Sequence, residues 1–407
     1  MDILKKYSFT DYMQWFYIYC MVCFGGMATP FRMTHDRFSL FILFTSSFII
    51  LWKGHRALNL TKSYVSFLLV LALALLCVMV CSSLTLGTSL STILTFEVVL
   101  ATYLLKPQNF LYRTTLFIAF LAAFSLVMFI LIEMLGFYTM VAVFSPISEV
   151  SFGRVSGEIY SYNFYIYNFV VQHMERNCGP FGEPGQYQCV LGAALFFVLF
   201  YKTNFKENTK VCLMFLFVAT MITTQSTSGY VSLLIIIAAY FLHGFLARHK
   251  DKQMNKAFRL LLVISIVFFC FTKSGHSFID RTISSKYDFK RHEILASGAS
   301  RQEGIDSAVN LISSRPEVLF GMGYDEALEN INSESGLLIY LLAVGLLPFS
   351  ILYGFLVRVS FKYSLGLHDA LAKLLIVLNM SLGQPHVLNP ILFLLILYPY
   401  LTSKRIK

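Results

Sequence analysis

The sequence predicts an all-α protein, a polytopic bundle of transmembrane helices with two large extracytoplasmic loops. Hydrophobic residues make up 57% of the 407 residues, and charged residues only 13%. The mean hydropathy is +0.67, a value typical of membrane proteins and not of soluble chains. Apolar runs recur from residue 12 to residue 401. The bilayer is therefore expected to be the solvent for most of the chain.

The apolar runs are long enough to predict individual spans. A spanning helix needs roughly 20 mostly apolar residues, and fewer where neighbouring helices shield its ends. We expect about twelve spans, with ten or eleven as alternatives. They are 12–30, 38–52, 64–84, 90–105, 111–135, 186–201, 211–224, 230–246, 260–272, 336–357, 370–384 and 389–402. Lys5 and Lys6 precede the first run without a small-residue cleavage site, so we interpret that run as a span and not as a removed signal.

The spacing of the runs divides the chain into five parts. These are about five helices in 1–135, a first large loop at 136–185, about four helices in 186–272, a second large loop at 273–335 and about three helices in 336–407. With both termini in the cytoplasm, inside segments hold twenty of the thirty-two basic residues. Outside segments hold four, apart from seven in the second loop, which is long enough to escape the positive-inside rule. Both loops are thus expected to face outward. The net charge of +10 needs no nucleic acid to explain it.

Apart from Arg113 at the inner end of its span, few charges lie inside the predicted spans, namely Glu97, Glu133 and Lys373. Glu133 is close to the outer end of its span. We expect Glu97 and Lys373 to pair across two helices as a structural ion pair, because no chain of acidic residues extends from either towards an ion pathway.

The first large loop contains a shaped segment directly before a span. Residues 176–185 read Arg-Asn-Cys-Gly-Pro-Phe-Gly-Glu-Pro-Gly, and three glycines and two prolines within ten residues predict a non-helical turn. Arg176 and Glu183 are expected either to face a site between helices or to be interfacial charges of a re-entry turn. The tyrosines and phenylalanines at 160–169 fit an interfacial aromatic belt or a surface that stacks on sugar rings.

The second large loop separates its charges. Residues 273–301 carry six basic residues against three acids, whereas 302–335 carry seven acids against Arg315 alone. Ser300 to Glu303 reads as a capping box that starts an amphipathic helix at 301–313, with Arg301 on its apolar face. Arg301 either snorkels to water or holds a buried anion. A third polar patch, 223–229, is expected to form an outward turn between spans, either as a plain turn or as a site for polar head groups.

Several classes of chemistry have no motif in this sequence. No metal-binding Asp-x-Asp pair, zinc-protease His-Glu-x-x-His, phosphate-binding loop or nucleophile elbow occurs. The eight cysteines lie mostly in apolar runs and are expected to be small core residues, with a Cys178–Cys189 disulfide as the alternative. We therefore expect no metal, no cofactor and no ATP hydrolysis.

The residues of both loops resemble a known family. The segment from Arg176 to Gly185 resembles the Arg…Gly-x-Phe-x-Glu-Pro segment of bacterial O-antigen and capsular polysaccharide repeat-unit polymerases, which belong to the O-antigen ligase and polymerase superfamily. A later pattern of this chain is also similar to that family. It consists of Arg301, Pro316, 321–323 and 334–335, which precede a span with Gly345. The related ligases have a His-Asn pair where this chain has Glu334 and Ser335, which favours the polymerases. Ser226 to Gly229 looks like the family's Ser-Arg-Gly turn but lacks the arginine.

The resemblance implies a function at the periplasmic face of the bacterial inner membrane. Such a polymerase joins oligosaccharide repeat units carried on undecaprenyl diphosphate and releases undecaprenyl diphosphate. The leaving diphosphate needs its charge stabilised, and without a metal motif guanidinium groups are the natural choice. A chain-length regulator and a flippase in the same membrane would be partners, and nucleic acid would not be one.

The resemblance and this chemistry together give the candidate site residues. The predicted catalytic residues are Arg176, Arg301, Glu183 and Glu334, with one of the two carboxylates deprotonating the acceptor hydroxyl. The predicted substrate-binding residues are Arg154, Arg281, Arg291, Arg315 and Tyr187. Two alternatives stay open. One is an O-antigen ligase that transfers glycan to lipid A core, and the other is a transporter of polysaccharide or lipid-linked sugar, which should instead concentrate charge inside the membrane.

Overall fold

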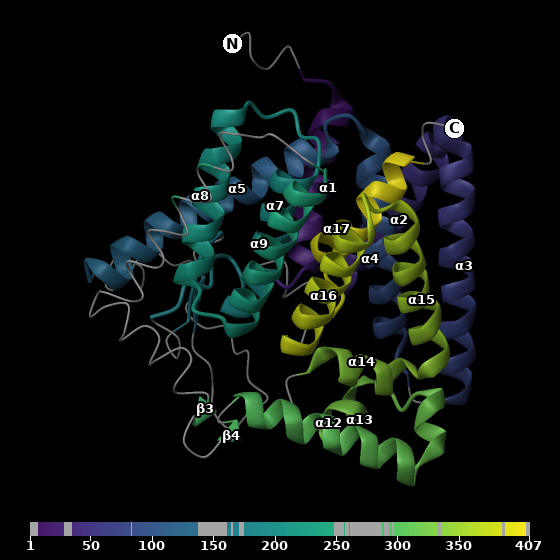
Figure 1. Ribbon diagram of the computed structural model, residues 1–407. Helices are drawn as coiled ribbons and strands as arrows, with labels where there is room; N and C mark the ends of the chain where they lie inside the picture. The colour runs from purple at the N-terminus through teal and green to yellow at the C-terminus, as the bar shows by residue number, and fades with distance from the viewer. Residues whose placement is uncertain are drawn as a thin grey trace.

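The protein is helical in a computed structural model (Figure 1). The structure describes residues 7–27, 35–82, 84–136, 161–163, 166–170, 175–247, 256, 260, 287–288, 293–294, 297–331, 335–384 and 387–403. Strands within these ranges form only two short antiparallel pairs. They are β1 (Ser161–Asn163) with β2 (Asn168–Val170), and β3 (Tyr287–Asp288) with β4 (Glu293–Ile294). The predicted helical class is therefore confirmed, with small hairpins in the two predicted loops.

The helices follow the apolar runs of the sequence. The N-terminal and central helices are α1 (Phe9–Phe24), α2 (His35–Gly54), α3 (Leu58–Cys81), α4 (Leu86–Leu105), α5 (Phe110–Phe129), α7 (Pro184–Phe200), α8 (Glu207–Thr223) and α9 (Thr227–Ala247). The C-terminal helices are α12 (Ser297–Ser314), α13 (Tyr324–Asn330), α14 (Gly336–Val344), α15 (Leu346–Tyr363), α16 (Leu367–Gly383) and α17 (Pro390–Ser403). Short helical turns are η3 (His55–Ala57), η4 (Ile130–Met134, a π-helix that contains Glu133) and η7 (Pro316–Phe320).

Six of the described helices are long and apolar enough to cross a bilayer. They are α2, α3, α4, α5 with the start of η4, α9 and α15. Helices α7 and α17 are apolar but shorter. Their burial accounts for this, because almost every residue of α7 lies inside the bundle, where other helices cover its ends. The described residues thus contain six candidate membrane spans, while the number of twelve spans stays a prediction. The predicted span 260–272 lies outside the described residues apart from Leu260.

The single span predicted at 336–357 is wrong, because two helices occupy this run. Helix α14 ends at Gly345, whose φ of 78° lies in the left-handed region that favours glycine, and α15 starts at the next residue. A Cβ on Gly345 would lie 2.6 Å from the backbone nitrogen of Gly321. The N–H groups of Met322 and Gly323 donate to carbonyls at the end of α14. Helix α14 consequently runs across the end of the bundle while α15 runs along it (Figure 1).

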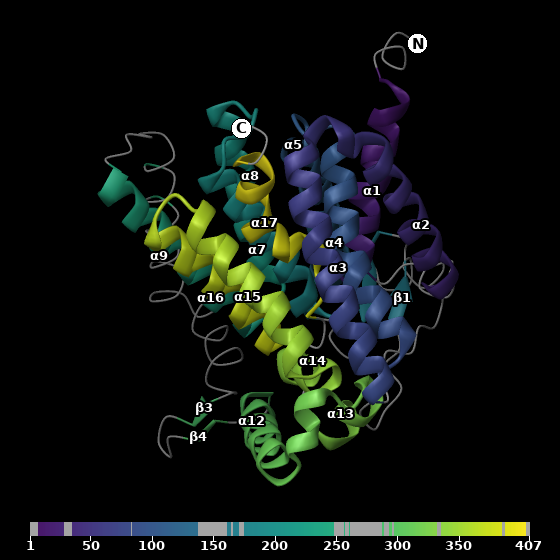
Figure 2. The ribbon, with the colours of Figure 1, turned by 90° about the vertical axis from the view of Figure 1, so that its right-hand side faces the viewer.

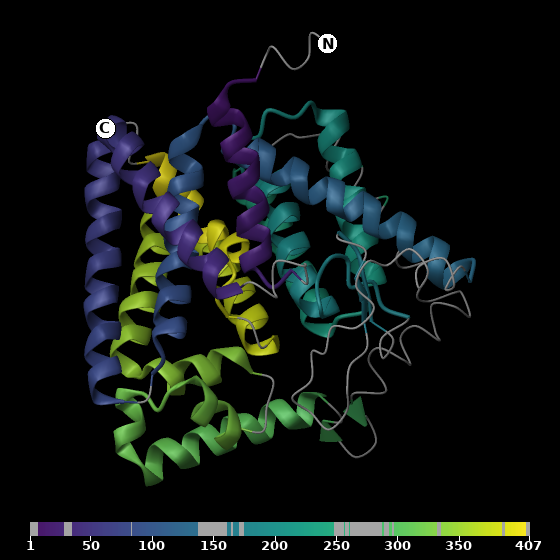
Figure 3. The same ribbon diagram turned by 180° about the vertical axis from the view of Figure 1, so that it is seen from behind.

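The two ends of the bundle differ in what they carry. Helix α1 starts and α17 ends at the same end, which we call the terminal end (Figure 1 and Figure 2). Helices α12, α13 and α14 lie at the opposite end, which we call the loop end, in every view (Figure 3). Large apolar side chains are exposed on several of the long helices, including Phe44, Leu51, Val80 and Phe245, each at least 79% exposed. Such an apolar surface is expected where lipid is the solvent.

Helix α12 covers the predicted amphipathic segment 301–313 but starts earlier. The predicted capping box is wrong, because the helix begins at Ser297 and Ser300 lies inside its first turn. On the predicted apolar face Ala308 is buried and Ile312 is half-buried, whereas Ile305 is 39% exposed. Together with η7, α13 and α14 this face forms a second, smaller core at the loop end.

The predicted pairing of Glu97 with Lys373 is also wrong. Lys373 donates from Nζ to Asp369 Oδ2 at 2.6 Å and to Ser364 Oγ at 3.0 Å. Asp369 lies one turn earlier on α16, so the pair needs no second helix. Glu97, on α4, instead accepts a short hydrogen bond from Ser47 of α2.

A buried ion pair ties three helices together at the terminal end. Asp11, on α1, accepts from Lys106 Nζ at 2.6 Å and from Arg113 Nη2 at 2.5 Å. Gln14 accepts from Arg113 Nη1 at 2.9 Å and donates to the carbonyls of Thr102 and Lys106. Burial alone would raise the pKa of the Asp11 carboxyl, but hydrogen bonds from Lys106, Ser8 and Arg113 hold it well below its ordinary value.

Candidate functional site

The segment 175–182 is fixed on the turn between α8 and α9. Asn177 is fully buried, donates its backbone N–H to the Thr223 carbonyl at 2.9 Å and donates Nδ2 to Thr223 Oγ1 at 3.0 Å. Its Oδ1 accepts from the Gly179 N–H at 2.9 Å. Gly179 has a φ of 53°, and a Cβ there would lie 2.4 Å from the Tyr187 ring. Gly179, one of the glycines predicted to shape this turn, therefore permits a close approach to α7.

Arg176 lies on the same turn, half-buried. Its Nε donates to the Thr224 carbonyl at 3.2 Å. The turn also donates back to the segment. Gln225, with a φ of 50°, donates from Nε2 to the Glu175 carbonyl at 2.8 Å. The two terminal guanidinium nitrogens of Arg176 make no hydrogen bond or ion pair with a residue that the structure describes. They are thus held in place and still have donors for a ligand.

Glu183 is the N-cap of α7. It is half-buried, its backbone is extended, and its carbonyl accepts from the Tyr187 N–H at 3.3 Å. A carboxylate at this position is favoured by the helix dipole. Phe181 just before it is fully buried and pairs by a β-bridge with Met27 at the end of α1. The start of α7 is therefore held by contacts before it, at Phe181, and after it, at Tyr187.

Tyr187, one of the predicted substrate-binding residues, is fully buried. Its ring stacks on Phe181 with centroids 5.5 Å apart, and its hydroxyl shares a hydrogen bond of 2.8 Å with Ser125 of α5. In this conformation the side chain supports the 175–182 segment from below and presents no surface to a ligand.

A set of neutral polar side chains lies beside Arg176, and sequence reasoning found only its part within 223–229. We call it the polar junction, and its members are Gln188, Thr224, Ser228, Ser232, Asn379 and Gln384. Gln188 donates Nε2 to the Met221 carbonyl at 2.9 Å and to Thr224 Oγ1 at 2.5 Å. Its Oε1 is buried with no hydrogen-bond partner among the described residues.

Two glycines let the side chains of the polar junction pack closely. A Cβ on Gly229 would lie 0.6 Å from Gln188 Oε1, and a Cβ on Gly185 would lie 1.9 Å from Gln384 Nε2. Gln384 also donates to Ser228 Oγ at 3.4 Å, so it contacts the first turns of both α7 and α9. The patch predicted at 223–229 as an outward turn is in part this helix start, because α9 begins at Thr227.

Asn379 completes the junction from α16. It donates Nδ2 to the Ser228 carbonyl at 2.6 Å and to Ser232 Oγ at 2.8 Å. The polar junction as a whole escaped prediction because its members are single uncharged residues. They lie on or directly after α7, α8, α9 and α16, far apart in sequence. The signal available in the sequence was the presence of two amide side chains, Gln188 and Gln384, inside apolar runs, together with the glycines Gly185 and Gly229.

Of the remaining predicted site residues, the structure describes the side chain of Arg315 alone. Arg315 is exposed at the C-terminal end of α12, and no described hydrogen bond or ion pair joins it to Arg176. Arg301 lies on α12, but its side chain lies outside the described residues. Arg154, Arg281, Arg291 and Glu334 lie outside them entirely. Cys178 and Cys189 form no disulfide, since each keeps a thiol that donates to a backbone carbonyl.

The arrangement is suited to holding an anion. Helices α7 and α9 both begin at the polar junction, and helix N-termini attract negative charge through their unpaired N–H groups. Arg176 adds a full positive charge next to the start of α9. Within the described ranges no group of three His, Cys, Asp or Glu side chains is placed to hold a metal ion. Comparison with protein-family models, with curated proteins and with solved structures gave no match.

Proposed function

We propose that this protein is a membrane-embedded glycosyltransferase that polymerises oligosaccharide repeat units carried on undecaprenyl diphosphate into O-antigen or capsular polysaccharide. The observation that carries the proposal is the hydrogen bonding of the Arg176 guanidinium. Its guanidinium is anchored through Nε on the α8–α9 turn, and its terminal nitrogens have no described partner. A planar fork of this kind matches two phosphate oxygens.

The chemistry of glycosyl transfer requires such a group. As the bond between sugar and diphosphate breaks, negative charge develops on the leaving oxygen, and a fixed cation stabilises it. Arg176 and the starts of α7 and α9 would take this role, with Arg301 as the second cation. Glu183 or Glu334 would accept the proton of the attacking hydroxyl. No metal ion enters this scheme.

The arrangement of the helices is compatible with the location that the proposal needs. We place the terminal end in the cytoplasm and the loop end in the periplasm, with about twelve spans between them. The substrate is then presented at the outer leaflet, where its sugars stay in water and its lipid enters between helices. A flippase and a chain-length regulator would act beside the protein in the same inner membrane.

Two other functions give different phenotypes. An O-antigen ligase would use the same lipid-linked donor but transfer finished glycan to lipid A core. A transporter should carry charged groups along a central path, whereas Lys373 is already paired within its own helix. The polymerase is preferred because Glu334 and Ser335 stand where the ligases have His and Asn.

The surface polysaccharide ladder of cells tests the proposal. The variants are Arg176→Ala, Arg176→Lys and, as a matched control, Lys202→Ala, which removes an exposed cation at the terminal end. With equal membrane levels, Arg176→Ala should leave single repeat units on lipid A core, and the control should keep the full ladder. Uncapped core with long lipid-linked polymer retained in the membrane would identify a ligase. An unchanged ladder in Arg176→Ala would refute the proposed role of Arg176.

A further inference from the structure

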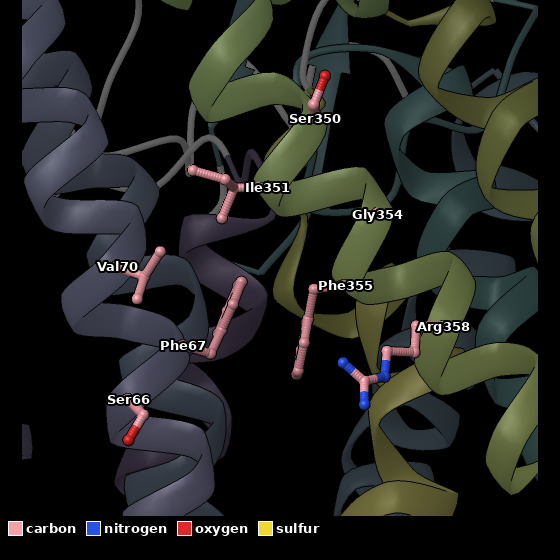
Figure 4. Close-up of a pocket in the computed structure, with 8 residues that line it drawn as sticks. All are labelled: Ser66, Phe67, Val70, Ser350, Ile351, Gly354, Phe355 and Arg358. Carbon is pink, nitrogen blue, oxygen red and sulfur yellow. The ribbon is translucent and has the colours of Figure 1, made fainter.

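A groove lies on the lipid-facing flank of the bundle, between α3 and α15. Its volume is about 420 Å³, and it is open to the outside along much of its length. Its floor is the pair Phe67 and Phe355, whose rings stack with centroids 3.8 Å apart and planes 12° apart (Figure 4). Val70 and Ile351 continue the apolar wall. None of the residues that line the groove belongs to the polar junction.

The groove stays open because one of its walls has no side chain. A Cβ on Gly354 of α15 would meet no heavy atom within 4 Å. Glycine lowers helix stability by about 1 kcal/mol relative to alanine. Its presence at an exposed helical position is therefore unfavourable for the helix, and what it provides here is space.

The length of the groove corresponds to one leaflet of a bilayer. Along α15 it extends from Ser350 to Arg358, which is about 12 Å at 1.5 Å per residue. The hydrocarbon core of a bilayer is about 30 Å thick, so one leaflet contributes about 15 Å. An acyl chain of the leaflet at the terminal end would lie along this length.

A single charge marks one end of the groove. Arg358 lies at the end away from Ser350, five residues before α15 ends at Tyr363 (Figure 4). It is exposed and makes no hydrogen bond or ion pair with a residue that the structure describes. Its Cα lies about 8 Å from the end of the helix. A guanidinium at this depth reaches the head-group layer and attracts phosphate.

We propose that this groove binds one anionic glycerophospholipid from the leaflet at the terminal end. One acyl chain lies on the Phe67–Phe355 floor, and the phosphate of the head group accepts hydrogen bonds from Arg358. The lipid-linked substrate is not the occupant, because its diphosphate is required at the loop end whereas Arg358 lies towards the terminal end. The exclusion of the lipid-linked substrate rests on the proposed function, whereas the groove and Arg358 do not depend on it.

Native mass spectrometry of the purified chain tests the proposal. The protein is exchanged into mixed micelles that hold equal amounts of phosphatidylglycerol and phosphatidylcholine, and the lipids that remain bound are counted. The variants are Arg358→Gln and Gly354→Leu, which fills the groove. The matched controls are Lys362→Gln, one turn further along α15, and Gly244→Leu on α9, where a Cβ also meets no atom within 4 Å.

The wild-type protein should retain one phosphatidylglycerol in preference to phosphatidylcholine. Arg358→Gln should weaken this binding on the order of tenfold, since a charge-assisted hydrogen bond is lost, and Gly354→Leu should abolish it. Both controls should bind as the wild type does. Undiminished phosphatidylglycerol in Arg358→Gln, or equal retention of phosphatidylcholine by the wild type, would overturn the proposal. If Gly354→Leu lowers the melting temperature more than Gly244→Leu does, the lipid retention of Arg358→Gln alone decides whether the proposal holds.

Discussion

The two ends of the bundle use polar groups in opposite ways. At the terminal end Asp11 is buried and saturated by Lys106 and Arg113, so three helices are held by charges that satisfy one another. At the loop end the polar junction consists of neutral side chains, and Arg176 is held through Nε without an ion pair among the described residues. Satisfied charges stabilise a structure, whereas a positioned charge that has no ion pair among the described residues can serve a ligand. Under the proposed function, this difference is the reason for placing the reaction at the loop end.

The largest effect that would sharpen this comparison is expected at Arg176. Removing one donor that stabilises a developing anion typically lowers turnover by about 10²–10³. Arg176→Ala should reduce polymer formation by this order while the melting temperature stays near that of the wild type. Arg176→Lys keeps the charge but loses the fork and should fall between the two. A melting temperature that drops with activity in both variants would instead mean a structural role.

A large loss of stability is expected at Asp11. Asp11→Asn leaves Arg113 and Lys106 close together without an anion, at a cost of about 3 kcal/mol. The matched control is Glu207→Gln, which breaks an exposed pair with Lys210 and should cost less than about 0.5 kcal/mol. Thermal melts of the detergent-solubilised protein check both values. Equal, small losses would show that the terminal end does not depend on this ion pair.

The acid dependence of stability should follow from the same carboxyl. Because the pKa of Asp11 is lowered in the folded protein, its contribution is complete above the unfolded pKa of about 3.9 and is lost as the pH falls below that value. The wild-type melting temperature should therefore decrease on acidification below about pH 4 more steeply than that of Asp11→Asn. Parallel curves would contradict the assignment.

A smaller effect is expected at the polar junction. Gly229→Ala places a methyl group on Gln188 Oε1 and should cost about 2 kcal/mol through displaced hydrogen bonds. Gly244→Ala, at an open position, should instead be neutral or slightly stabilising. In a double-mutant cycle Gln188→Ala should recover part of the loss caused by Gly229→Ala. Strictly additive losses would mean that the two residues do not interact.

The smallest effect is expected at Arg315. Its side chain is exposed at the end of α12, away from Arg176, so Arg315→Ala should change the melting temperature and the polysaccharide ladder little. Surface substitutions of this kind usually lie within about 0.5 kcal/mol. A ladder as short as that of Arg176→Ala would show that α12 moves to the polar junction during the reaction.

The sequence predicted helix positions well because apolar runs determine them almost alone. It failed at 336–357, since the run is apolar throughout and only Gly345, with Pro348 in the next turn, signals the break. The partner of Lys373 was missed because the predicted span began at 370 and left Asp369 outside.

The candidate site was predicted in part and for a similar reason. Arg176 and Glu183 were found because they lie in one segment with an unusual density of glycine and proline. Gln188, Ser228, Asn379 and Gln384 meet only after α7, α9 and α16 have packed. No local spacing in the chain reports such a contact between single neutral residues.

The most direct test of the central claim is polymerisation by the purified chain in lipid vesicles that contain an undecaprenyl-diphosphate-linked repeat unit, with a metal chelator present. Product length is read by mass spectrometry for the wild type, Arg176→Ala and Lys202→Ala. The account predicts lipid-linked dimers and longer products from the wild type and from Lys202→Ala, and a loss of about 10²–10³ in rate for Arg176→Ala. Absence of any product longer than one repeat unit from the wild type, or full activity of Arg176→Ala, would contradict it.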